Sequence, residues 1–142
     1  MYFIDASVFL RYITKDDPEK AESCFKLFKS MERGEVKAYT SEAVVAEIVY
    51  VLSSKNLYGL SHEDVRARLQ PLLSLPGLKL PSRKVVLRAL SLYALHSIDF
   101  EDALSIARME RLGIEKIISY DRDFDRVEGI ARVEPEDVVG TE

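Results

Sequence analysis

The chain alternates short apolar runs with longer stretches in which apolar residues recur every three or four positions. Apolar runs predict four strands and a candidate fifth, at residues 2–4, 36–40, 78–80, 116–119 and 130–133. The amphipathic stretches predict helices at residues 8–13, 18–34, 42–55, 61–73, 82–94 and 100–112. Strands joined by helices form a parallel sheet covered on both faces, so we expect a three-layer α/β/α fold around a central parallel sheet of four to five strands. No repeat or linker interrupts this pattern, and we expect one domain over residues 1–142.

The first predicted strand, Tyr2 to Ile4, leads directly into Asp5. An apolar run bounded by a polar residue is typical of a buried strand in a parallel sheet. Asp5 would then stand at the carboxyl end of that strand, where open α/β sheets place their ligands. Asp5 therefore marks a candidate site, and other acids that converge on it would define its chemistry.

Asp121 and Asp123 follow the predicted strand 116–119 in the way that Asp5 follows the first strand. If these two strands are neighbours, their carboxyl ends lie ~5 Å apart, which would bring Asp121 to Asp5. The structural alternative is an acidic turn that caps a following helix. A calcium loop of the EF-hand type is excluded, because its sixth position is Arg126 rather than Gly and its twelfth is Arg132 rather than Glu.

Glu47 has mostly apolar residues three and four positions away on its predicted helix, among them Val44 and Val51. A carboxylate on a core-facing stripe must be paired, protonated or bound to a metal, because its unpaired burial costs several kcal/mol. The alternative is that Glu47 lies at the edge of the stripe and reaches water or a basic side chain.

Asp102 has two compatible interpretations. With Asp99 as N-cap, it would be the third residue of a helix and form a carboxylate variant of the capping box. It also shares a helical face with Ile98 and Ile106, and acidic residues are uncommon on such an apolar face. A carboxylate at a helix start stays ionised, so Asp102 is also a candidate metal ligand.

Overall composition adds little about partners. The chain has 24 acidic and 20 basic residues, and a net charge of -4 argues weakly against a nucleic-acid partner unless bound cations neutralise a group of acids. The single cysteine, Cys24, excludes an internal disulfide and fits a reducing cytosol. No apolar run approaches the ~20 residues of a membrane helix, so we expect a cytoplasmic protein with no membrane contact.

Several carboxylates within ~5 Å repel one another, and a divalent cation removes that conflict. Ligation by oxygen alone points to Mg²⁺ or Mn²⁺, and such a site suits phosphodiester hydrolysis. No phosphate-binding glycine loop is present. Arg11 lies one helical turn after Ser7, and Lys15 lies one turn further, so both are candidates for contact with phosphates. A solvated helix face explains these two cations equally well.

Four segments together resemble the PIN-domain family, and in particular its VapC-like toxin ribonucleases, along nearly the whole chain. The segments are Phe3-Ile4-Asp5-Ala6-Ser7-Val8, residues 41–47 ending in Glu47, Asp99-Phe100-Glu101-Asp102-Ala103-Leu104, and Ser119-Tyr120-Asp121-Arg122-Asp123-Phe124. In the last segment Ser119 stands where the family has threonine. None of the four is specific alone, but their order and spacing are.

By this resemblance Asp5, Glu47, Asp102 and Asp121 would be the catalytic acids and hold Mg²⁺ or Mn²⁺. Asp123 would be a further ligand, with Ser7 and Ser119 in support. The family also implies cleavage of single-stranded RNA, a homodimer, and a small antitoxin protein that blocks the site.

Two other functions remain open from the sequence. One is a regulatory or scaffolding domain that keeps the acids and a metal but only binds RNA or protein. The other is a phospho-receiver domain, which is disfavoured because residues 39–41 provide no aspartate after a central strand and no lysine follows the last one.

Overall fold

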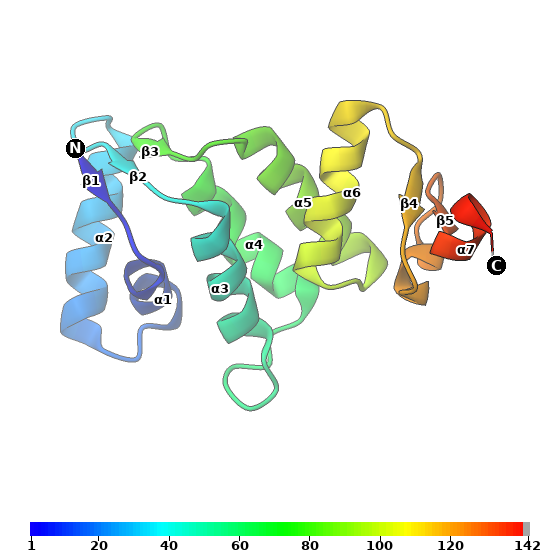
Figure 1. Ribbon diagram of the computed structural model, residues 1–142. Coiled ribbons are helices and arrows are strands. Elements are labelled where there is room, and N and C mark those ends of the chain that lie inside the picture. Colours follow the sequence, from blue (N-terminus) through cyan, green and yellow to red (C-terminus); the bar gives the residue numbers. More distant parts are fainter. Residues whose placement is uncertain (141–142) are drawn as a thin grey trace.

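Strands and helices alternate along residues 1–140, which are the residues that the computed structural model describes (Figure 1). The strands are β1 Tyr2–Phe3, β2 Ala38–Tyr39, β3 Leu78–Lys79, β4 Lys116–Ile118 and β5 Ala131–Val133. The α-helices are α1 Ala6–Thr14, α2 Pro18–Glu32, α3 Glu42–Ser53, α4 His62–Leu73, α5 Arg83–His96, α6 Phe100–Leu112 and α7 Pro135–Val139. A 3₁₀ helix, η1, covers Arg122–Arg126. The predicted α/β class is confirmed.

Side-chain caps explain where several helices begin. Asp17 accepts a hydrogen bond from the Lys20 N–H before α2, and Ser41 accepts one from Val44 before α3. Ser61 does the same before α4, which satisfies a backbone N–H that has no partner within the helix. Gly113 ends α6 in the left-handed conformation, with φ +70°, a region that glycine occupies without strain.

The strands form two parallel sheets rather than the single sheet that we predicted. One sheet has the order β1-β2-β3, and the other contains β4 and β5. Figure 1 shows β1 at one end of the molecule and β4 at the other, with helices α3 to α6 between them. The number of strands is as expected, but the expected neighbourhood of β1 and β4 is not found within this chain.

The first strand is also less buried than its apolar sequence predicts. Ile4 is 4% exposed, whereas Tyr2 and Phe3 are 69% and 62% exposed. The physical reason is that β1 is an edge strand: β2 is its only partner among the described residues. A strand needs neighbours on both sides before a continuous apolar run becomes buried.

The hydrophobic core lies mainly among the helices. Its fully buried large side chains include Phe9, Met31, Ile48, Leu52, Leu69, Leu73, Leu90 and Ile106. The segment after α6 joins this core through Phe124 and Val127, each 5% exposed. Within residues 1–140, no helix is both long enough and apolar enough to cross a membrane.

Candidate metal-binding site

Three carboxylates meet where α6 begins and β4 ends. Asp102, Asp121 and Asp123 each offer an oxygen atom, and these atoms lie within 4.8 Å of one another. Asp102 is in the first turn of α6, whereas the other two belong to the segment that follows β4. The structure thus brings together three of the five predicted metal ligands, which come from segments almost twenty residues apart in the sequence.

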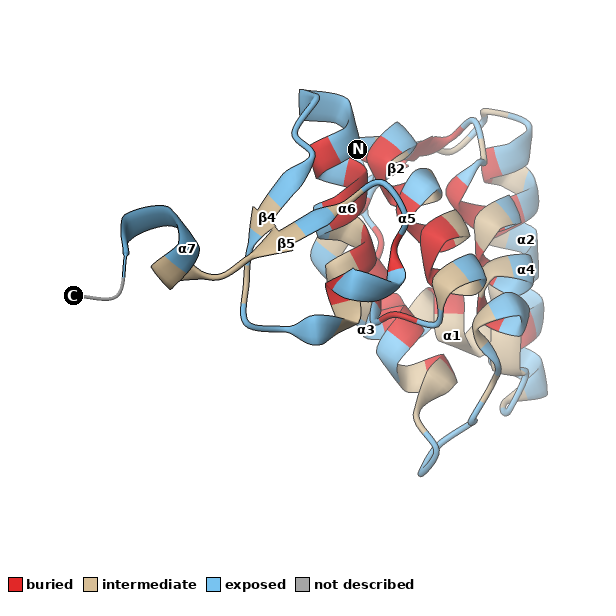
Figure 2. Cartoon of the chain, turned by 90° about the vertical axis from the view of Figure 1, so that its right-hand side faces the viewer, coloured by how far each residue is buried: buried red, intermediate tan, exposed pale blue. Residues whose placement is uncertain are grey.

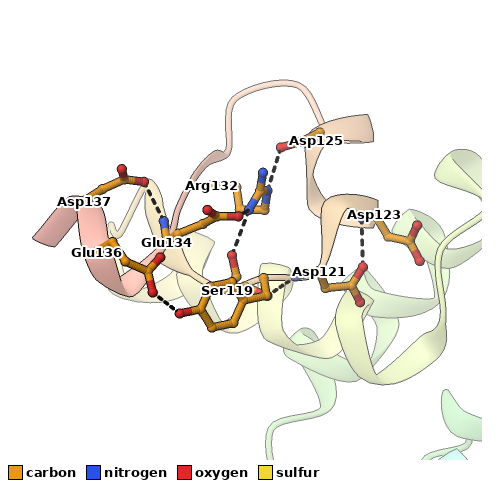
Figure 3. Close-up of polar contacts among 9 residues, drawn as sticks. Ser119, Asp121, Asp123, Asp125, Arg132, Glu134, Glu136 and Asp137 are labelled. Carbon is orange, nitrogen blue, oxygen red and sulfur yellow. Dashed lines mark hydrogen bonds and ion pairs between the residues drawn. The ribbon is translucent and has the colours of Figure 1, made fainter. Parts of the chain in front are cut away.

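Short hydrogen bonds shape the segment that carries Asp121 and Asp123 (Figure 3). The Asp121 carboxylate caps η1 by accepting a hydrogen bond from the Asp123 N–H at 2.9 Å. The Ser119 hydroxyl in turn accepts one from the Asp121 N–H, also at 2.9 Å. Asp121 therefore caps a helical turn, as the structural alternative expected, and it also offers a carboxylate oxygen to the group of three, so its role as a metal ligand stays a prediction. Ser119 therefore lies next to Asp121, and its supporting role stays a prediction.

Arg132, on β5, connects the segment that contains Asp121 and Asp123 to β4 and β5 through polar contacts. Its guanidinium lies 3.1 Å from the Asp125 carboxylate and 3.0 Å from that of Glu134, and it donates to the Ser119 carbonyl at 2.9 Å (Figure 3). The Arg132 side chain is only 13% exposed. The sequence analysis missed this residue. Its signal was a lone arginine in a strand flanked by acids.

The Asp102 carboxyl is partly buried and lies close to other carboxylates. Partial burial raises the pKa of its carboxyl, and the negative charges of Asp121, Asp99 and Asp123 raise it further. The Asp99 side chain makes no cap hydrogen bond, so the expected carboxylate capping box does not form. The Asp102 carboxylate is therefore free to bind a cation, which would relieve the repulsion.

Asp5 lies at the other end of the molecule. It is the exposed N-cap residue of α1, and its carboxylate accepts a hydrogen bond from the Ser7 hydroxyl at 3.2 Å. Ser7 therefore lies beside Asp5, and its supporting role stays a prediction. Asp5 does not belong to the group formed by Asp102, Asp121 and Asp123.

Glu47 is exposed on α3 and also lies outside that group. Its neighbours Ala43 and Tyr50 are exposed too, while Val44 and Ile48 are buried. One side of α3 therefore faces the core, and Glu47 lies on the side that is exposed to solvent. Of the two interpretations of Glu47, the structure favours the one in which it lies at the edge of the apolar stripe and reaches water, and its role as a ligand stays a prediction.

The two candidate phosphate-binding cations line different hollows. Arg11 shares a hollow with Ser7 and Lys20, next to Asp5. Lys15 lines another one, together with apolar side chains and Glu22. Arg11 and Lys20 therefore place positive charge beside Asp5, and Lys15 does not. The sequence analysis missed Lys20, which lies in the first turn of α2 rather than on α1.

The donor set fits a hard divalent cation. Asp102, Asp121 and Asp123 offer carboxylate oxygens alone, and the negative charges of the other two add to the effect of burial in raising the pKa of Asp102. Mg²⁺ and Mn²⁺ prefer such oxygen ligands, whereas zinc usually takes histidine or cysteine. Three carboxylates would leave coordination positions of an octahedral Mg²⁺ open to further ligands.

Comparison with known proteins adds two findings. The sequence profile of the PIN domain matches residues 2–130. A VapC ribonuclease of Aquifex aeolicus (strain VF5) is 24% identical to this chain over 135 residues, which span 95% of this chain and 97% of that protein.

Proposed function

The chain belongs to the PIN-domain family, and from this premise we propose that it is a Mg²⁺- or Mn²⁺-dependent endoribonuclease. Its substrate would be single-stranded or looped RNA, and it would act as the toxin of a toxin–antitoxin pair. The observation that carries the proposal is the convergence of Asp102, Asp121 and Asp123 in a chain of this family. Similarity to a VapC ribonuclease along nearly the full length supports the choice of RNA.

We assign the ion to Asp102, Asp121 and Asp123. Asp5 and Glu47 lie outside this group in one chain, so they would join the ligand set only if a second copy supplies them. A bound ion would polarise a phosphoryl oxygen and lower the pKa of a water molecule. The carboxylates hold the ion and orient that water, and none serves as a covalent nucleophile. Ser7 and Ser119 fix the orientation of the acids beside them, through hydrogen bonds of 3.2 Å to the Asp5 carboxylate and 2.9 Å to the Asp121 N–H.

The assigned partners are RNA, a second copy of the chain and a small antitoxin protein that covers the acids. Arg11 is the cation best placed to meet a phosphate, because it lies beside Ser7 and Asp5. Lys15 would bind RNA only if the strand continues over the hollow near Tyr12. A cytoplasmic location follows from this role.

A cleavage assay tests the enzyme. The protein is incubated with a pool of structured RNA in Mn²⁺ or in EDTA, alongside Asp5→Asn and Asp121→Asn. We expect cutting that needs the metal and that each substitution abolishes. Glu101→Gln is the matched control, because Glu101 lies in the same helical turn as Asp102 but outside the three carboxylates. It should cut normally.

A non-catalytic scaffolding role is the alternative. It would be favoured if the folded protein binds Mn²⁺ and RNA but cuts neither RNA nor DNA. The exposed positions of Asp5 and Glu47, away from the three grouped acids, make this outcome worth testing.

A further inference from the structure

We propose that two copies of this chain exchange strands, so that β4 of one copy pairs in parallel with β1 of the other. The pairing would complete each metal site with Asp5 from one copy and Asp102, Asp121 and Asp123 from the second. This inference rests on the proposed function for its consequence in catalysis. Its structural basis is independent of that function.

The free edge of β1 has unused backbone groups. The Ile4 N–H donates to the Tyr39 carbonyl at 2.8 Å, so Ile4 directs its backbone toward β2. Successive residues of a strand point their N–H and C=O groups to opposite sides, and Phe3 therefore directs its own away from β2. The exposed side chains of Tyr2 and Phe3 flank this edge.

The free edge of β4 is complementary. The Ser119 N–H donates to the Val133 carbonyl, and the Glu115 carbonyl accepts from the Ala131 N–H, each at 2.9 Å. Residues 115, 117 and 119 therefore face β5, while Lys116 and Ile118 direct their backbone groups to the open side. Ile118 is 59% exposed, and Figure 2 shows much of β4 and its surroundings as exposed surface.

These groups can pair when Phe3 lies opposite Ile117, which is the register that we propose. With Phe3 opposite Ile117, the Phe3 N–H would donate to the Lys116 carbonyl, and the Ile118 N–H would donate to the Phe3 carbonyl. Asp5 would then lie opposite Ser119, which is two residues before Asp121. The resulting sheet would be parallel throughout, in the order β3-β2-β1-β4-β5, with the last two strands from the second copy.

A second copy is a better source of β4 than the same chain. Figure 1 shows helices α3 to α6 between β1 and β4. Phe124 and Val127 are buried against those helices and hold the β4–β5 segment in place. Pairing within one chain would require this contact to break.

Symmetry closes the assembly. If β4 of the first copy reaches β1 of the second, the two-fold axis brings the reverse pair together at the same time. Both exposed inner edges, which would otherwise promote uncontrolled association, are then covered. A dimer therefore satisfies all four edges with one kind of contact and gives two composite sites.

Complementation between inactive variants tests the composite site. Asp5→Asn and Asp121→Asn chains are co-expressed with different tags, and the heterodimer is purified through both. One of its two sites would hold only intact acids, so we expect about half the wild-type cleavage rate from a pair of chains that are each inactive alone. A site built within one chain would leave the heterodimer inactive, and that result would overturn the proposal.

Cross-linking provides a readout that does not depend on activity. In the proposed register Tyr2 lies opposite Lys116, and both are exposed. Chains carrying Cys24→Ser with Tyr2→Cys and chains carrying Cys24→Ser with Lys116→Cys are mixed by unfolding and refolding together, then oxidised. A disulfide-linked dimer of one chain of each kind is expected. Leu95→Cys, an exposed position on α5 and outside the proposed strand pair, replaces Lys116→Cys in the control and should give no such dimer.

The two experiments separate the two proposals. A cross-link between chains without any RNA cleavage by the wild type would refute the ribonuclease and leave the strand exchange standing. If the chain carrying Cys24→Ser and both new cysteines forms only a bond within itself, strand pairing occurs in one chain and the exchange is wrong. A monomer that forms neither bond would leave the β1 edge to another protein, such as an antitoxin strand, and would equally overturn it.

Discussion

The Asp102 carboxylate, in the first turn of α6, lies beside the Asp121 carboxylate, which follows β4, with ligand oxygens within 4.8 Å. Each carboxylate also has a role in its own segment: Asp121 caps η1, and Asp102 lies in the first turn of a helix, where negative charge is favoured. These local roles do not explain why the two carboxylates lie so close together. Their proximity adds to the effect of partial burial in raising the pKa of Asp102. The repulsion is the basis for the first two predictions.

Replacing Asp102 by Asn should stabilise the protein without metal and remove its stabilisation by metal. The charge that Asp121 and Asp123 repel is lost, which is worth a few tenths to about 1 kcal/mol for groups near the surface. Thermal unfolding in EDTA and in Mn²⁺ measures both effects. At one hundred times its dissociation constant, Mn²⁺ should stabilise the wild type by about 2.7 kcal/mol and the variant far less.

Glu101→Gln is the control for this prediction, since it removes a like charge from the same helical turn, outside the group of three. It should keep the Mn²⁺ effect. If Asp102→Asn keeps that effect in full, the ion binds elsewhere and the ligand assignment is wrong.

The raised pKa of Asp102 also predicts how stability depends on pH. The folded state holds this proton more tightly than the unfolded state, in which the carboxyl titrates near 3.8. The free energy of unfolding therefore loses the Asp102 contribution as pH rises from that value through the raised pKa. Compared with the wild type, Asp102→Asn should become relatively more stable across that interval.

Urea unfolding of both proteins in EDTA, at intervals between pH 3 and pH 7, measures this difference while the other carboxylates cancel. If the Asp102→Asn variant instead becomes less stable than the wild type toward neutral pH, a basic side chain of the protein pairs with Asp102.

Sequence patterns predicted the elements well because their signals are local. Ser41, Ser61 and Gly113 begin or end helices through hydrogen bonds or backbone conformation within four residues. Helix α7 was missed although Pro135 stands at its first turn and Glu134 forms a capping box with Asp137. This helix has only five residues, which are too few to show the apolar periodicity on which the helix predictions rest.

Which strands lie next to each other could not be predicted from the sequence. A strand of two or three residues, such as β1 or β4, has two edges, and its apolar pattern does not state which other strand lies along each. The convergence of Asp102 with Asp121 was predictable from resemblance to a family. The exposure of Glu47 was not, because the local pattern around it is apolar whether or not another element covers that side of α3.

Arg132→Ala should loosen the segment that carries Asp121. The guanidinium has three acceptors, Asp125, Glu134 and the Ser119 carbonyl, so its loss should lower the free energy of unfolding by more than the loss of an exposed surface pair. Urea unfolding gives the change, and Mn²⁺ titration should show weaker binding.

Arg88→Ala is the matched control for Arg132. Arg88 also makes two hydrogen bonds to a carboxylate, that of Glu110, but its side chain is 51% exposed. Its loss should cost about 0.5 kcal/mol and leave Mn²⁺ binding unchanged. Equal losses for the two variants would show that Arg132 has no special part in holding the segment.

Arg11→Ala should weaken RNA binding more than Lys15→Ala. Arg11 lies with Ser7 and Lys20 in the hollow beside Asp5, whereas Lys15 shares its hollow with Glu22. Both variants are made together with Asp5→Asn, so that the RNA stays intact, and binding of a labelled single strand is followed by fluorescence anisotropy at several salt concentrations. Loss of one phosphate contact should reduce the slope of log affinity against log salt by about 0.7, and Lys15→Ala should leave the slope unchanged. A larger effect of Lys15→Ala would place the RNA over the outer end of α1, away from Asp5.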